Sequence, residues 1–366
     1  MNVPFVDFKA ALYAMRKDIS IACDNVVAGG NLILGSELAA FEKEFADYSD
    51  ASFCVGVANG LEAISLSLRA LGIKRGDEVI VPSQTFIATW LAVSHVGAIP
   101  VEVDVEADTV LIDVDKIEDA ITPKTRAIIP VHLFGQSVDM SRVIEIARRH
   151  NLYVVEDAAQ AHGARYNGAR VGSFGDLAAF SFYPTKNLGA SGDGGAIVTQ
   201  NAELAARLKR LRNYGSEQKY FHQEVGYNSR LDELQAAYLR IKLRRLDEEN
   251  MRRRKAAEYY IENLKKVPSI RLLDLKADRE HVFHLFVIMV KGRDQVLEKM
   301  RALGIDVAVH YPIIPGDQLA YAWNTDRDTC IFGRQAAKDG LSLPIWPDIT
   351  TAQQDSVIQA LCQAIV

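Results

Sequence analysis

Two residues near the middle of the chain carry the most informative chemistry. Lys186 lies in the run Ser181-Phe-Tyr-Pro-Thr-Lys-Asn-Leu-Gly, and Asp157 lies in Glu156-Asp-Ala-Ala-Gln160. A lysine amine can form an imine with an aldehyde, while a buried aspartate stabilises a protonated pyridine nitrogen and keeps that ring a strong electron sink. The pair therefore predicts the chemistry of a pyridoxal phosphate enzyme, and neither residue says much without the other.

The segment Ala58-Asn-Gly-Leu-Glu62 is a candidate phosphate site. It lies between a predicted strand and a predicted helix, where free backbone N–H groups at the helix start can hold an anion, and Gly60 permits close approach. An ordinary turn also requires a glycine, so this signal is weak alone. Ser181, close to Lys186 in sequence, supplies a hydroxyl that could also take phosphate.

Other patterns that resemble functional motifs have simpler interpretations. The glycines from Gly189 to Gly195 precede a strand and do not link a strand to a helix, so they are not a dinucleotide fingerprint. His162 has no second ligand at i+4, which favours support below a cofactor over a metal site. The cysteines are scattered without zinc spacing and are interpreted as core thiols: Cys23, Cys54, Cys330 and Cys362.

Short apolar runs alternate with helical patterns from about residue 50 to 200. Strands are predicted at 53–57, 78–82, 99–103, 127–131 and 152–156, with helices beginning at Leu61, Thr85 and Asp139. This alternation builds a mostly parallel sheet covered by helices on both faces. Sites in such sheets lie at the carboxyl ends of the strands.

Unusual polar and glycine residues follow these strands. They are found at 59–60, 83–86, 132–135 and 157–160. One such loop is common in any α/β fold, but several at the same sheet edge predict one shared crevice.

The chain is long enough for a large and a smaller domain, at 366 residues. Helical periodicity runs from Arg230 to about Lys266, and 284–290 resembles a strand. We expect a large domain over residues 1–249, including an N-terminal segment, and a small α/β domain over 250–366.

Composition excludes several classes of protein. The formal net charge of −5 gives no reason to expect nucleic-acid binding, and the basic run 252–255 follows acidic residues at 247–249 with which it can pair along a helix. No apolar run approaches a bilayer span, which argues against a membrane protein. The first residues lack the pattern of a secretory signal, so we expect a cytoplasmic protein.

With these motifs in place, the chain resembles the sugar-nucleotide aminotransferases of the DegT/StrS type, which are pyridoxal phosphate enzymes of fold type I, the aspartate aminotransferase fold. The resemblance covers nearly the whole chain and is highly specific. The segments that carry it are Phe5-Val-Asp-Phe, Val81-Pro-Ser-Gln-Thr-Phe-Ile-Ala-Thr, His132-Leu-Phe-Gly-Gln, Val155-Glu-Asp-Ala-Ala-Gln-Ala-His-Gly-Ala, Ser181-Phe-Tyr-Pro-Thr-Lys-Asn-Leu-Gly, Arg212-Asn-Tyr-Gly, Gly226-Tyr-Asn-Ser-Arg-Leu-Asp-Glu-Leu-Gln-Ala-Ala and His310-Tyr-Pro.

The resemblance implies a role for each matching residue. Lys186 would bind the cofactor covalently and carry protons, and Asp157 would pair with the pyridine nitrogen. The remaining implied cofactor contacts are Gln160 with the ring hydroxyl, Phe86 stacked on the ring, Ser181 and the Gly60–Leu61–Glu62 backbone with the phosphate, and Asn228 with the cofactor of the partner subunit. The last contact implies a homodimer with shared active sites. Leu61 replaces a threonine common in the family, so only the backbone contact is expected there.

The resemblance also implies a substrate. Asn-Gly-Leu-Glu-Ala at 59–63, with Tyr214-Gly-Ser and Lys219-Tyr220, is most similar to enzymes that aminate C3 of a dTDP-3-keto-6-deoxyhexose with L-glutamate as donor, giving 2-oxoglutarate. Tyr183, His310 and Tyr311 are the candidates for contacting the sugar. The alternatives are amination at C4 of a UDP- or dTDP-4-keto sugar, a pyridoxal phosphate-dependent sugar dehydratase, and a non-catalytic regulatory protein. Related dehydratases carry histidine in place of the lysine, so Lys186 argues against that reading.

Overall fold

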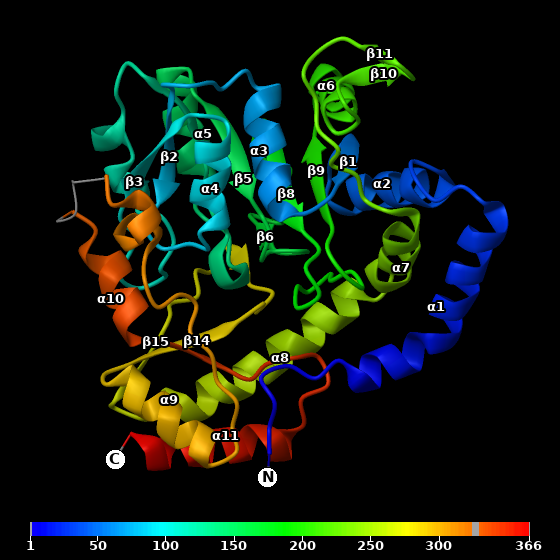
Figure 1. Ribbon diagram of the computed structural model, residues 1–366. Helices are drawn as coiled ribbons and strands as arrows, with labels where there is room; N and C mark the ends of the chain where they lie inside the picture. The colour runs from blue at the N-terminus through cyan, green and yellow to red at the C-terminus, as the bar shows by residue number, and fades with distance from the viewer. Residues whose placement is uncertain (1, 324–328, 366) are drawn as a thin grey trace.

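A computed structural model describes residues 2–323 and 329–365. Its centre is a seven-stranded sheet in which β9 alone runs antiparallel to its neighbours (Figure 1). In spatial order the strands are β1 (Phe53–Val57), β9 (Gly195–Thr199), β8 (Leu177–Ser181), β5 (Tyr153–Asp157), β4 (Thr125–Ile128), β2 (Glu78–Pro82) and β3 (Ile99–Val103). The predicted mostly parallel sheet is confirmed.

Helices connect these strands and cover the sheet. They are α3 (Gly60–Ala70), α4 (Ala88–His95), α5 (Met140–His150) and α6 (Ala202–Leu211). Polar side chains fix where the helices begin: Asn59, Asp139 and Asn201 each accept hydrogen bonds from backbone N–H groups of the first turn. These starts follow the carboxyl ends of strands, so they contribute to the predicted crevice.

Two element boundaries differ from the prediction. Helix α4 begins at Ala88 and not at Thr85, because residues 83–87 form a loop whose side chains bond to other segments. Strand β4 ends at Ile128, two residues before Pro130, which has no N–H to extend the ladder.

A smaller α/β unit lies below the large sheet in Figure 1. Its sheet is antiparallel, in the order β12 (Ile270–Leu272), β14 (Phe286–Val290) and β15 (Gly340–Leu343). The helices of this unit are α8 (Leu246–Leu264), α9 (Arg293–Ala302), α10 (Ile331–Asp339) and α11 (Thr351–Ala364). Val3 is buried in the same core and pairs with Ile305, so the first residues pack with the C-terminal unit.

The helical pattern predicted from Arg230 to Lys266 forms two helices. Helix α7 (Glu233–Leu243) ends just before α8 begins, with a turn at Arg244–Arg245. The sequence carries no glycine or proline there, so periodicity alone could not predict the break. Since α8 runs through residue 250, the division into 1–249 and 250–366 remains our proposal.

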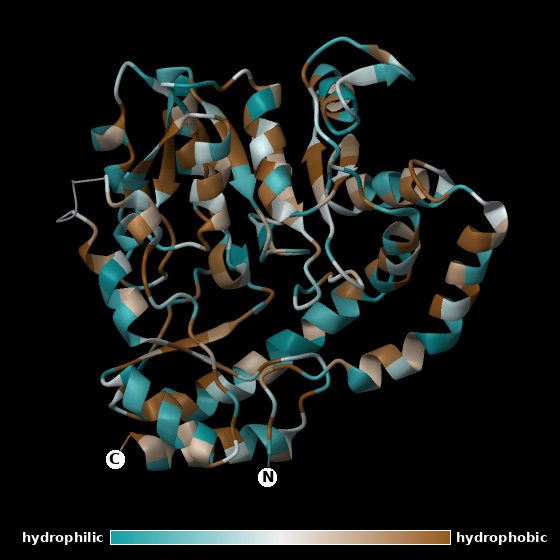
Figure 2. Ribbon diagram, viewed as in Figure 1, coloured by the Kyte–Doolittle hydropathy of each residue, from teal (hydrophilic) through white to brown (hydrophobic). Residues whose placement is uncertain are grey.

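The N-terminal helices lie beside α7 at the edge of the molecule (Figure 1). The carboxylate of Glu233 accepts hydrogen bonds from the backbone N–H groups of Gly35, Glu37 and Leu38 and so fixes the start of α2. These elements are α1 (Lys9–Gly29) and α2 (Ser36–Tyr48). Figure 2 shows hydrophobic and hydrophilic residues interspersed along α1.

The remaining elements are short. A hairpin of β10 (Ser216–Gln218) and β11 (Phe221–His222) projects from the large unit (Figure 1), and β6 (Arg165–Tyr166), β7 (Ala169–Arg170) and β13 (Arg279–Glu280) form a small sheet. Single 3-10 turns occur at 114–116, 118–120, 133–135, 315–317 and 319–321. Within the described part of the chain, no helix combines the length and apolarity needed to cross a bilayer.

Candidate active site

The loop that carries Lys186 joins β8 to β9 and is closed on itself. The N–H of Lys186 donates to the carbonyl of Tyr183 at 2.8 Å, and the N–H of Ala190 donates to that of Phe182 at 2.7 Å. A Cβ at position 189 would collide with the carbonyl oxygen of Pro184, so the turn requires Gly189. The backbone therefore holds the lysine in a fixed position.

Asn187 anchors this loop from below. Its Nδ2 donates to Oδ1 of Asn250 at 2.8 Å and to the carbonyl of Val282 at 3.0 Å. Asn250 in turn donates to the carbonyl of His162 at 2.8 Å. Helix α8 thus holds the lysine loop against the segment that follows Asp157.

Burial lowers the pKa of Lys186 to about 8, and the negative charge of Asp157 only partly opposes that shift. A substantial fraction of the amine is therefore neutral near physiological pH. A neutral amine is the form that attacks a carbonyl carbon, so the electrostatics suit the predicted role.

Asp157 ends β5 with its side chain buried, 5% exposed. Its Oδ2 accepts from Oγ1 of Thr89 at 2.8 Å, and its Oδ1 accepts from the N–H of Ala159 at 3.2 Å. Burial raises the pKa of Asp157, whereas these hydrogen bonds and the positive charge of Lys186 lower it. A carboxylate in this setting favours a positively charged partner such as a protonated ring nitrogen.

Gln160 is buried beside this carboxylate with its amide orientation fixed. Its Oε1 accepts from the backbone N–H of Phe134 at 2.7 Å, so its Nε2 is the group that donates to the hydroxyl of Tyr311 at 3.0 Å. The ring of Tyr311 lies 5.3 Å from that of Phe86, which is 52% exposed. The structure thus brings Phe86, Asp157, Gln160 and Tyr311 together.

The candidate phosphate residues form a second group. A Cβ added to Gly60 would lie 2.6 Å from Cβ of Ser181, so only glycine lets the two segments approach this closely. Oγ of Ser181 accepts from the N–H of Tyr183 at 3.3 Å, which leaves its own proton to donate. The N–H of Glu62 donates to Oδ1 of Asn59 at 2.9 Å. The first-turn N–H groups left for an anion are therefore those of Gly60 and Leu61.

Histidines around Lys186 are held neutral. Burial and the positive charge of Lys186 lower the pKa of His162 to about 3 and that of His310 to about 4. The ring of His162 lies against Phe180 and Phe182, and Nδ1 of His310 pairs with Oγ of Ser342 at 2.8 Å. No cluster of potential metal ligands occurs in residues 2–323 and 329–365.

The neighbouring carboxylate, Glu156, has a structural role. It accepts hydrogen bonds from the N–H groups of Gly172, Phe174 and Gly175 and pairs with Nε2 of His132 at 3.0 Å. Because Nδ1 of His132 accepts from the N–H of Val138, the proton of this imidazole lies on Nε2. The polar loop at 132–135 thus supports the site from behind.

The other predicted residues lie at its margins. Tyr183 is 53% exposed, and the ring of His310 lies 5.5 Å from that of Tyr311. Asn228 is exposed in the segment that follows the β10–β11 hairpin, where the backbone bridges to Asn213. Its contact with a partner's cofactor remains a proposal.

Sequence reasoning assigned no role to Thr85 and Thr89. Their hydroxyls lie 2.8 Å apart, and that of Thr89 contacts Asp157. The signal available in the sequence was their spacing of four residues beside the predicted ring-stacking residue, which places them on one face of a helical turn.

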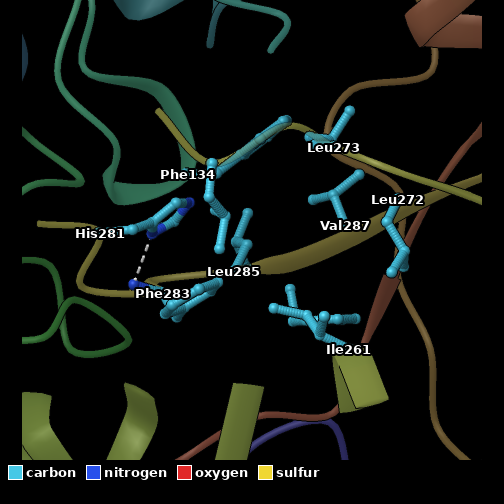
Figure 3. Close-up of a pocket in the computed structure, with 10 residues that line it drawn as sticks. Phe134, Ile261, Leu272, Leu273, His281, Phe283, Leu285 and Val287 are labelled. Atoms are coloured by element: carbon cyan, nitrogen blue, oxygen red, sulfur yellow. Dashed lines mark hydrogen bonds between the residues drawn. The ribbon is translucent and has the colours of Figure 1, made fainter. Parts of the chain in front are cut away.

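Two cavities help to place the cofactor. The one in Figure 3 holds about 30 Å³, is lined mainly by apolar side chains around Phe134 and Phe283, and is too small for a substrate. A pocket of about 570 Å³ lies between α1 and the lysine loop; its lining includes Lys186 but not Asp157, Gln160 or Ser181. We therefore place the cofactor by the contacts of those three residues and not by the larger pocket.

Pyridoxal phosphate fits this arrangement. Lys186 supplies a partly neutral amine, Asp157 a carboxylate, Gln160 an amide donor, and the Gly60–Ser181 approach leaves donors for a phosphate. The groups match the aldehyde, ring nitrogen, ring hydroxyl and phosphate of that one molecule.

Comparison with known proteins agrees with this geometry. The family model described as the DegT/DnrJ/EryC1/StrS aminotransferase family matches residues 14–362. The dTDP-3-amino-3,4,6-trideoxy-alpha-D-glucose transaminase of Streptomyces venezuelae is 49% identical, covering 98% of this chain and 95% of the relative. The dTDP-3-amino-3,6-dideoxy-alpha-D-galactopyranose transaminase of Aneurinibacillus thermoaerophilus is 50% identical, covering 98% of each chain.

Among solved structures, S. venezuelae DesV in complex with a ketimine intermediate superposes with a TM-score of 0.97 at 49% identity, covering 99% of this chain and 98% of that one. The whole length is thus matched by sequence and by fold. The chain belongs to the DegT/DnrJ/EryC1/StrS aminotransferase family and is a pyridoxal phosphate enzyme.

Proposed function

We propose that this enzyme transfers an amino group to C3 of a nucleotide-linked keto sugar, most specifically converting a dTDP-3-keto-6-deoxyhexose to a dTDP-3-amino-3,6-dideoxyhexose with L-glutamate as donor. The observation that carries the proposal is full-length identity of about half to two relatives named for 3-amino sugars on dTDP. The Lys186, Asp157 and Gln160 set needed for a transaminase is intact.

Each residue has a task in this reaction. When bound, pyridoxal phosphate supplies an electron sink that stabilises negative charge at the carbon losing its proton. Asp157 holds the ring nitrogen and Gln160 the ring hydroxyl, while Ser181 and the N–H groups of Gly60 and Leu61 hold the phosphate. Lys186, neutral in part at pH 8, takes a proton from the donor carbon and delivers one to C3 of the sugar. Tyr183, His310 and Tyr311 line the side from which the sugar approaches.

The enzyme acts as a homodimer in this proposal. Exposed apolar side chains gather on α1 and the loop after it and on the β10–β11 hairpin, more than a monomer ordinarily leaves to water. They are Leu12, Tyr13, Ile21, Val27, Leu32, Ile33, Leu34, Tyr220, Phe221 and Val225. Burying this surface against a second copy would bring Asn228, next to the hairpin, toward the partner's cofactor.

We also place the enzyme in the cytoplasm. The four cysteines are free thiols, as expected in a reducing compartment. Amination at C4 and sugar dehydration remain the competing reactions, and Lys186 argues against dehydration.

Visible absorption tests the proposal in two steps. Purified enzyme loaded with pyridoxal phosphate should lose its lysine-bound absorption on addition of L-glutamate and regain it with a dTDP-3-keto-6-deoxyhexose. Recovery with a 4-keto sugar and not with the 3-keto sugar would move the reaction to C4. Recovery with UDP-linked 3-keto sugars alone would change the nucleotide but keep the position.

A further inference from the structure

The carboxylate of Asp157 is held by a chain of two buried hydroxyls. Thr89 is 0% exposed and Thr85 is 2% exposed. Oγ1 of Thr89 donates to Oδ2 of Asp157 at 2.8 Å, and the two threonine Oγ1 atoms also lie 2.8 Å apart. Neither threonine belongs to the groups assigned above to the cofactor or sugar.

The chain has a direction. An ionised carboxylate only accepts hydrogen bonds, and a hydroxyl has one proton to give. Since Thr89 spends its proton on Asp157, the bond between the threonines is donated by Thr85 and accepted by Thr89. A protonated Asp157 could reverse the order, so the arrangement favours the ionised form.

The backbone makes this chain rigid. Helix α4 starts at Ala88, and the N–H of Thr89 donates to the carbonyl of Phe86 at 3.1 Å. The adjacent Trp90 is fully buried and donates from Nε1 to the carbonyl of Pro82 at 3.1 Å. The same turn therefore presents Phe86 to the ring and Thr89 to the carboxylate.

We propose that Thr89, supported by Thr85, is a positioning residue that keeps Asp157 ionised and aimed at the ring nitrogen of pyridoxal phosphate. The inference rests on the proposed cofactor contacts of Asp157. Lys186, His132 and Tyr311 are the other titratable groups that act on this carboxylate. Burial opposes ionisation of Asp157, and the hydrogen bond from Thr89 is the largest effect that counters it.

Thr89→Val tests the role because valine keeps the shape and removes the hydroxyl. A ring nitrogen that loses its proton withdraws less electron density from the nitrogen shared with Lys186, so that nitrogen becomes more basic. The pH midpoint of the visible absorption of the lysine-bound cofactor should rise by about one unit, a tenfold change in that equilibrium. The half-reaction with L-glutamate should slow by about tenfold, matching one lost charge-assisted hydrogen bond.

Two further variants separate positioning from folding. Thr89→Ser keeps the hydroxyl and should restore both values to within about twofold of wild type. Thr199→Val removes another buried hydroxyl, which donates to the carbonyl of Asp176 outside the site, and should change neither. Should Thr89→Val not fold, Thr85→Val provides the same test, with a smaller shift expected in the same direction.

An absorption midpoint in Thr89→Val equal to that of wild type would overturn the inference, as would equal shifts in Thr89→Val and Thr89→Ser. Neither readout involves the sugar. A wrong sugar assignment would instead appear in the wild-type enzyme, as glutamate conversion without recovery by the keto sugar, and would leave this comparison intact.

Discussion

Gln160 donates a hydrogen bond from Nε2 to the hydroxyl oxygen of Tyr311, 3.0 Å away and 151 residues later in the chain. Because Oε1 of the same amide accepts from the N–H of Phe134, the second Nε2 proton is left for the cofactor ring hydroxyl. A residue close to the small unit thus orients an amide of the large sheet.

Removing that hydroxyl should loosen the ring. We expect Tyr311→Phe to bind pyridoxal phosphate about tenfold more weakly, because Gln160 loses the acceptor that fixes one of its two protons. Equilibrium titration of the cofactor-free enzyme measures this affinity. Tyr259→Phe is the control, since its hydroxyl pairs with Asp355 away from the site. Equal affinities in the two variants would show that Tyr311 does not orient Gln160.

Cofactor loading should depend on the protonation of Lys186. Only the neutral amine attacks the aldehyde, so the loading rate should rise about tenfold per pH unit below 8 and level off above it, following the pKa of about 8. Stopped-flow absorption on the cofactor-free enzyme records the profile. Asp157→Asn removes the charge that raises the pKa of Lys186, so its midpoint should be lower. A wild-type midpoint near the ordinary lysine pKa would mean that Lys186 is solvated.

Gly60→Ala should damage phosphate binding. The new Cβ would lie 2.6 Å from Cβ of Ser181, forcing the start of α3 away from the β8 segment and separating the donors. We expect at least a tenfold loss of pyridoxal phosphate affinity with much less effect on pyridoxal, which lacks the phosphate. Leu61→Thr is the companion variant, because it changes only a side chain at the same helix start. Similar losses for both ligands would place the phosphate elsewhere.

Shared active sites predict recovery of activity in mixed dimers. Lys186→Ala should retain the dimer and abolish turnover, and Asn228→Ala should lose much of its activity. A site in the hybrid that takes Lys186 from one subunit and Asn228 from the other is intact, so random exchange should restore about a quarter of the wild-type sites. Turnover measured after co-refolding the two variants tests this. Activity that never exceeds the sum of the separate variants would contradict a shared site.

Acid should destabilise the cofactor-free enzyme through its buried histidines. Burial lowers the pKa of His162 and His281 to about 3 and that of His310 to about 4, so between those values and 6.5 the unfolded chain binds more protons. The free energy of unfolding should therefore fall as pH drops through this window, by about 1.4 kcal/mol per pH unit for each proton involved.

A single substitution isolates one of these histidines. His162→Phe keeps a ring against Phe180 and Phe182 but cannot titrate, so its stability should fall less steeply with acid. The exposed His95 provides the control as His95→Gln, which should keep the wild-type slope. Urea unfolding between pH 7 and 4.5 gives the slopes, and an unchanged slope in His162→Phe would show that His162 already titrates normally in the folded state.

The sequence alone determined the architecture and the central pair of residues. Short apolar runs that alternate with helical periods predict a parallel sheet, because burial on both faces imposes that pattern locally. The positions of Lys186 and Asp157 after two of its strands then follow from chain order. Such features depend on neighbours within a few residues, which a linear pattern records.

Only the tertiary structure decided how the site is held. The bond from Thr89 to Asp157 spans 68 residues, and the late start of α4 follows from contacts made by residues 83–87. The break between α7 and α8 has no glycine or proline to announce it. The N–H of Glu62 is taken by Asn59, which narrows the phosphate donors to Gly60 and Leu61. Each of these depends on which side chains and carbonyls meet after folding, and local periodicity does not encode those meetings.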